Sequence, residues 1–69
     1  MNNPEALKEA LRNAGAKARV MTIAELLNVT RITASGKLNG KVPFKDYEIK
    51  ILADRFGWDA ETVYSLFLK

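Results

Sequence analysis

Lysine and arginine are the side chains best suited to bind a ligand in this sequence, and they are unevenly distributed. Residues 17–45 contain six of the eleven Lys and Arg residues against a single acid, Glu25, which gives a net charge of +5. Residues 1–16 are neutral overall and residues 46–69 carry −2. A basic block between neutral and acidic segments is typical of a surface that binds phosphate groups. An unevenly charged, merely solvated surface gives the same pattern, so charge alone leaves both interpretations open.

Side chains for catalysis and metal binding are scarce. The chain has no cysteine and no histidine, so disulfides are excluded and a structural zinc site is not expected. Asp46 and Glu48 are neighbouring carboxylates, but acids are favoured at a helix start, which accounts for both. Gly36-Lys37 lacks the upstream glycine of a phosphate loop. We therefore expect no enzyme, no cofactor and no metal.

Length and hydropathy indicate one small domain over residues 1–69. The chain is 48% hydrophobic and 28% charged, a globular composition with a thin core. Its start lacks the basic flank and apolar stretch of a signal peptide, and no run approaches the roughly 18 apolar residues of a membrane span. The expected location is the cytoplasm. The aromatic residues expected in the core are Phe44, Phe56, Trp58 and Phe67.

Helical periodicity predicts an all-α chain. Apolar residues recur three and four positions apart, in segments bounded by residues that favour helix ends. No segment alternates cleanly enough to be a strand. Asp59 is a good N-cap for the last helix. Four of the five expected helices span about residues 4–14, 31–38, 46–56 and 60–68, and the second ends near residue 27.

The boundaries of the second and third helices depend on a few residues. Thr30 is a predicted N-cap, and Asn28 is a predicted stop because asparagine tolerates positive φ. The start of the second helix is open. Thr22 and Glu25 form a capping-box pair, whereas the apolar pattern allows a start near Val20.

Residues 23–41 hold the most informative pattern, which predicts a helix, a tight turn and a second helix. Ala24 has the small side chain needed where two helices cross, and Val29 can fill the angle between them. On a helical wheel Ala34 and Leu38 point inward. A face without bulk or acid suits a DNA major groove about 12 Å wide, and it is formed by Ile32, Ser35, Gly36 and Asn39.

This stretch resembles the helix-turn-helix of the Cro and lambda-repressor-like family of small phage and bacterial regulators. The family's second helix commonly reads Ser-Arg-x-Thr-x-Ser-x-Lys-Leu-Asn-Gly-Lys, and residues 30–41 match it without a gap, with Thr30 in place of serine. The likeness covers about residues 20–57, including Pro43-Phe44 and Glu48-Ile49. It implies a five-helix lambda-repressor-like domain with the helix-turn-helix at its second and third helices.

The sequence departs from the family at three places. Asn28 replaces the usual turn glycine. Arg19-Val20 replaces the usual Thr or Ser followed by Gln, so the phosphate contact made there is not carried over. Gly36 stands where relatives often have a base-reading side chain. Glycine costs a helix roughly 1 kcal/mol against alanine, so Gly36 either allows close approach to DNA or reflects drift.

The resemblance implies a transcriptional regulator, repressor or Cro-like, that binds double-stranded DNA at a palindromic operator. Base contacts are expected from Arg31, Ile32, Ser35 and Gly36. Backbone contacts are expected from Lys17, Arg19, Thr30, Thr33, Lys37, Asn39, Lys41 and Lys45. Simple solvation is the alternative for the lysines, and a helix stop is the alternative for Asn39.

Two expectations concern protein partners. One recognition helix reads few base pairs, so a weak homodimer is expected, with Tyr64 and Leu68 at its interface because they fall outside the core-facing stripe. Alternatively, both belong to the core. The second functional hypothesis is a small protein-binding module that sequesters a regulator. An apolar patch on the third helix would favour it, and Ile32 is the outward apolar residue there. Neither a membrane nor a small-molecule substrate is expected.

Overall fold

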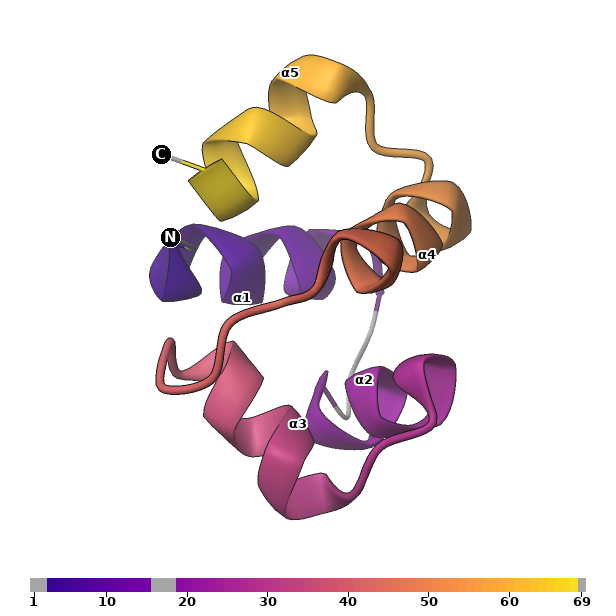
Figure 1. Cartoon of the computed structure of the whole chain (residues 1–69). Coiled ribbons are helices and arrows are strands. Elements are labelled where there is room, and N and C mark those ends of the chain that lie inside the picture. Colours follow the sequence, from indigo (N-terminus) through magenta and orange to yellow (C-terminus); the bar gives the residue numbers. More distant parts are fainter. Residues whose placement is uncertain (1–2, 16–18, 69) are drawn as a thin grey trace.

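The computed structural model of the protein describes residues 3–15 and 19–68 (Figure 1). These residues contain no strand, so the predicted all-α class is confirmed for them. A short π-helical segment, η1, continues from the fifth α-helix. The elements are α1 (Pro4–Asn13), α2 (Arg19–Leu27), α3 (Arg31–Leu38), α4 (Asp46–Phe56), α5 (Ala60–Val63) and η1 (Tyr64–Leu68).

Most helix ends lie where their local sequence predicts. The Thr33 N–H donates to Thr30 Oγ1 at 3.2 Å, which caps α3. The Thr62 N–H donates to Asp59 Oδ1 at 2.8 Å in the same way. Asn28 has φ 56°, a left-handed conformation that ends α2 without a glycine.

Two helix predictions need correction. The capping-box start at Thr22 is wrong, because α2 begins at Arg19 and Thr22 lies inside it. Val20 packs against the core from the first turn, which favours the longer helix. The last helix is not α-helical throughout, since its backbone widens to a π-helix at Tyr64. A π-helical segment of about one turn is too short for apolar periodicity to distinguish it from an α-helix.

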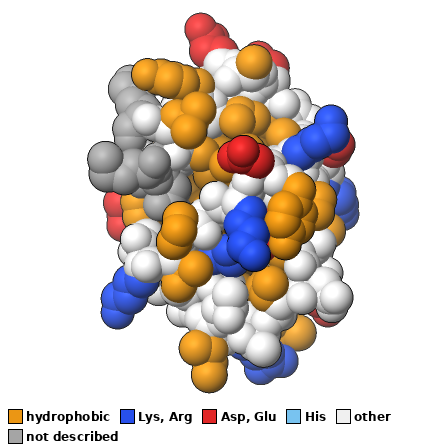
Figure 2. All heavy atoms as spheres, viewed as in Figure 1, with side chains coloured by type: hydrophobic (Ala, Val, Ile, Leu, Met, Phe, Trp, Pro, Cys, Tyr) orange, Lys and Arg blue, Asp and Glu red, His pale blue; other side chains and the backbone are white. Residues whose placement is uncertain are grey.

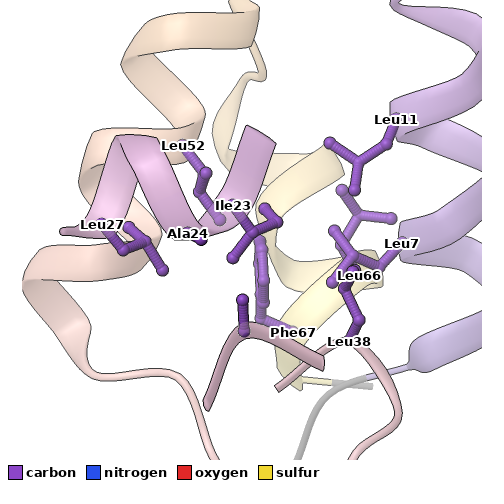
Figure 3. Packing of buried hydrophobic residues seen from close by; sticks show 10 residues of the cluster. Leu7, Leu11, Ile23, Ala24, Leu27, Leu38, Leu52, Leu66 and Phe67 are labelled. Carbon is purple, nitrogen blue, oxygen red and sulfur yellow. The ribbon is translucent and has the colours of Figure 1, made fainter. Parts of the chain in front are cut away.

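The core lies where α1, α2, α3, α4 and η1 meet, and Figure 3 shows its side chains pointing toward one another. Each fully buried Leu, Ile or Phe side chain contributes about 1.5–3 kcal/mol through removal from water. The buried hydrophobic residues are Leu7, Leu11, Ile23, Ala24, Leu27, Ala34, Leu38, Leu52, Leu66 and Phe67.

Aromatic residues extend the core toward the C-terminal end of the chain. Phe67 is buried, and its ring lies 5.1 Å from that of Phe44, edge to face, and 6.2 Å from that of Trp58. Phe56 stacks on Trp58 at 5.1 Å. All four therefore belong to the core or its border, as predicted. Pairs of this kind add about 0.5–1.5 kcal/mol beyond burial.

The packing leaves α3 at one end of the molecule and α5 at the other (Figure 1). α2 packs on α3 more extensively than on any other element, and the small Ala24 and Ala34 are both buried. The N- and C-terminal parts of the described chain are tied together by the Asn3 N–H, which donates to the Leu66 carbonyl at 2.8 Å. None of the helices built by residues 3–15 and 19–68 combines the length and apolar character needed to cross a membrane.

Candidate nucleic-acid interface

The outer face of α3 is the candidate interface, and its most exposed apolar residue is Ile32. That side chain is 86% exposed, whereas Ala34 and Leu38 on the opposite face are 0% and 2% exposed. Arg31 is exposed beside Ile32. α3 is thus held to the core by one face and presents Arg31 and Ile32 away from it, and the helical wheel predicted Ile32 to lie outward.

Arg31 is linked to α2 through a sulfur contact. Its guanidinium Nη2 donates to Met21 Sδ at 3.6 Å, and Met21 is itself 41% exposed. A neutral, polarizable sulfur is a weak acceptor, so the guanidinium keeps its charge and most of its donors for another acceptor. The contact orients Arg31 without neutralising it.

The two threonines of this region serve the helix cap. Besides accepting from the Thr33 N–H, Thr30 donates its hydroxyl to Thr33 Oγ1 at 3.1 Å. Thr30 is exposed and Thr33 is half-buried. A phosphate contact from either threonine hydroxyl would replace one of these cap bonds or be made in addition to them.

Lys37 does not lie on the outer face, so its assignment as a phosphate contact is wrong. The side chain is 3% exposed. Its ammonium donates to Glu48 Oε1 at 2.7 Å and to the Pro43 carbonyl at 3.0 Å, and it lies 5.5 Å from the centre of the Phe44 ring. A wheel places Lys37 about 60° from the buried Ala34, close enough to the inward face for its long stem to turn inside.

Glu48 is the partner that the sequence analysis missed. It is 2% exposed, and its Oε1 also accepts the Lys45 N–H at 2.9 Å. Burial raises the pKa of Glu48, but the hydrogen bonds from Lys37 and Lys45 and the charges of both lysines outweigh burial and lower it below its ordinary value. Removing one partner of a buried pair typically costs about 3–5 kcal/mol.

A signal for this pair was present in the sequence. Glu48 precedes Leu52 by one helical turn, which puts a carboxylate on the buried stripe of α4. Lys37 borders the buried stripe of α3 in the same way. Opposite charges on two inward-facing stripes favour a buried ion pair, since a buried charge needs a partner.

Gly36 is explained by the chain itself, and neither close approach to DNA nor drift is needed. A Cβ at this position would lie 2.9 Å from Val42 Cγ2. The Gly36 carbonyl accepts the N–H groups of Lys41 at 2.8 Å and Val42 at 3.1 Å. The missing side chain lets residues 41 and 42 fold back onto α3, so Gly36 is only partly accessible to a ligand.

Asn39 ends α3, which supports the helix-stop alternative. Its Nδ2 donates to the Ser35 carbonyl at 3.0 Å and approaches Ser35 Oγ at 3.4 Å. Its Oδ1 accepts from Lys8 Nζ at 2.9 Å. Lys8 of α1 therefore brings a cation beside α3 from 31 residues away, and no local pattern indicated it. Ser35, an expected base contact, is half-buried in this arrangement.

The remaining cations of the basic block divide between two places. Arg19 is half-buried at the start of α2, and Lys41 and Lys45 are exposed in the segment between α3 and α4. Lys45 Nζ lies 6.0 Å from the centre of the Tyr47 ring. Lys17 lies outside the described residues. In Figure 2, acidic side chains are prominent at the upper end over α5, away from α3.

Tyr64 and Leu68 lie at the surface of η1. They are 56% and 59% exposed, so the alternative that both belong to the core is wrong. Their expected role at a dimer interface stays a prediction. Comparison of the chain with family models, curated proteins and solved structures found no match.

Proposed function

We propose that the protein binds double-stranded DNA and regulates transcription by occupying an operator. In this proposal α2, the turn at residues 28–30 and α3 act as a helix-turn-helix, within the lambda-repressor-like arrangement that the sequence resembles. The observation that carries it is the face of α3, where Arg31 and the 86%-exposed Ile32 stand outward while Ala34 and Leu38 anchor the helix.

The chemistry of this face suits base recognition. A guanidinium can donate two hydrogen bonds to guanine O6 and N7, and an apolar side chain can contact the methyl group of thymine. Arg31 and Ile32 offer these two groups on adjacent residues. Lys41 and Lys45, exposed beyond the end of α3, supply charge for phosphates, which sets affinity but not sequence.

Selection of bound sequences from a random DNA pool tests the proposal, with enrichment of a half-site motif as the expected result.

On that site Arg31→Ala should weaken binding about 5- to 150-fold more than on random DNA, as a lost base contact of about 1–3 kcal/mol predicts. Lys41→Ala should weaken all sequences alike. Lys50→Ala, which removes an exposed cation of α4, is the matched control and should change little. Equal loss on both DNAs for Arg31→Ala would reassign Arg31 to the backbone.

A second candidate is a protein-binding module of the same fold. Three exposed apolar side chains favour it: Met21 at 41%, Ile32 at 86% and Val42 at 36%. Met21 contacts Arg31, the neighbour of Ile32 in α3, and Val42 lies over Gly36, one turn from Ile32. Adjacent exposed apolar groups can mark a protein-binding surface. A DNA pool that yields no enriched sequence would favour this function.

A further inference from the structure

Residues 39–45 connect α3 to α4, and hydrogen bonds hold them at several points along their length. At the start, the N–H groups of Lys41 and Val42 donate to the Gly36 carbonyl. Further on, the Pro43 carbonyl accepts from Lys37 Nζ at 3.0 Å. At the end, the Lys45 N–H donates to Glu48 Oε1 at 2.9 Å. The second and third of these bonds both depend on the Lys37–Glu48 pair.

We propose that Lys37 and Glu48 are positioning residues that fix residues 39–45 so that Lys41 and Lys45 face the phosphate backbone of the DNA bound by α3. The proposal rests on the DNA-binding function proposed above. Lys37 and Glu48 do not touch the DNA in it. They act through the Pro43 carbonyl, which lies between the two exposed lysines, and through the Lys45 N–H.

Directionality is the reason for a charged pair at this place. Apolar side chains of similar size could fill the same volume, and such replacements often leave stability unchanged or raise it. Apolar contacts, however, do not specify the path of a loop, whereas hydrogen bonds from one ammonium to a carboxylate and a carbonyl do. The Lys37 ammonium is nearly equidistant from Glu48 Oε1 and the Pro43 carbonyl oxygen, at 2.7 and 3.0 Å, so the positions of α3, Pro43 and α4 become linked.

The test replaces the pair by apolar residues, with the double variant Lys37→Met and Glu48→Leu in the full chain. A matched control, Lys50→Met with Asp54→Asn, also removes one cation and one carboxylate, but from exposed positions of α4. Three readouts apply to each variant: helix content, hydrogen exchange of the Lys41 and Val42 amides, and the slope of log K against log salt for DNA binding.

The apolar variant should keep its helix content but exchange the Lys41 and Val42 amides at least tenfold faster. Its salt slope should become shallower by up to about 1.8, since each phosphate contact contributes about 0.9. The control should match the wild type in all three. An apolar variant that folds with the wild-type salt slope and amide protection would overturn the proposal.

Glu48→Asp provides a second variant if the apolar one fails to fold. It keeps the charge but withdraws the carboxylate by one methylene, and it should show the same changes at smaller amplitude. Loss of folding in both variants would overturn the proposal, because the pair would then be needed for folding itself. If the wild type binds no DNA, the function fails while amide exchange still tests the positioning.

Discussion

The same substitution should affect different properties at two lysines four residues apart, Lys37 and Lys41. Lys→Met removes the charge and keeps most of the volume at either site. Lys37 is 3% exposed and bonded to Glu48, whereas Lys41 is exposed. Lys37→Met should therefore damage stability, and Lys41→Met should damage binding alone.

The expected magnitude follows from burial. Lys37→Met leaves the Glu48 carboxylate 2% exposed and without its cation, which costs about 3–5 kcal/mol. A domain of 69 residues has a free energy of unfolding of about 3–10 kcal/mol at about 0.05–0.15 per residue. The substitution should thus remove about 30% of the stability or more. Lys41→Met should stay within about 0.5 kcal/mol of the wild type, as surface changes do.

Urea unfolding followed by circular dichroism measures both free energies. Adding Glu48→Leu to Lys37→Met should recover most of the loss, because it removes the unpaired carboxylate. A loss below about 1 kcal/mol for Lys37→Met, equal to that of Lys41→Met, would show that Lys37 is solvated. Lys37 would then again be a candidate phosphate contact, and its ion pair with Glu48 would contribute little to stability.

Three further predictions concern pH, packing and assembly. Folding lowers the pKa of Glu48 from 4.5, so the contribution of Glu48 to stability should be complete above about pH 4.5 and should be lost as pH falls through its pKa in the folded state. Urea midpoints measured across this pH range should vary less in Glu48→Gln than in the wild type. The variant keeps Asp59, whose pKa is also lowered, so some pH dependence should remain. Gly36→Ala gains about 1 kcal/mol of helix propensity, but its Cβ would lie 2.9 Å from Val42 Cγ2. The substitution should therefore be more stabilising in a Val42→Ala background than in the wild type, by at least about 0.5 kcal/mol. Equal effects in both backgrounds would mean that Val42 moves freely. Polar substitution of the exposed Tyr64 and Leu68 should leave the monomer folded and abolish self-association and cooperative operator binding, whereas unchanged cooperativity would place the interface elsewhere.

Helix ends were predictable because their causes are local. Thr30 and Asp59 cap the helices that follow them by bonding N–H groups three residues ahead, and Asn28 adopts a left-handed conformation by itself. The start of α2 at Arg19 was harder to predict. No helix-breaking residue lies between Arg19 and Thr22, so the sequence allows either a start capped by Thr22 or a helix that begins earlier. Packing of Val20 against the core favours the longer helix.

The candidate site was predictable only on the outer face of α3. Arg31 and Ile32 point outward for the periodic reason that puts Ala34 and Leu38 inside. Lys37 was misassigned because a family motif gives a residue type without its surroundings. Its partner Glu48 is 11 residues away, and the two meet only when residues 39–45 fold back. The same fold-back explains Gly36, whose neighbour Val42 cannot be inferred from α3 alone.

Because Lys37 is buried, fewer cations of the basic block, residues 17–45, are available to a ligand. Of its six cations, one is neutralised by Glu48 and one lies outside the described residues, which leaves Arg19, Arg31, Lys41 and Lys45 against Glu25. Arg31 is the cation of this block on the outer face of α3, and its neighbours there are Met21 and Ile32.

A surface that bound phosphates alone would need little apolar area, because affinity for the backbone comes from charge. A pure protein-binding surface would not need the exposed Lys41 and Lys45 beside it, in a segment bonded to the Gly36 carbonyl and to the Lys37–Glu48 pair. A weakly charged, partly apolar helix face beside a separate basic segment matches the two kinds of contact, to bases and to the backbone, that a DNA-binding domain makes. This division is the reason that we propose DNA, and not a protein, as the partner.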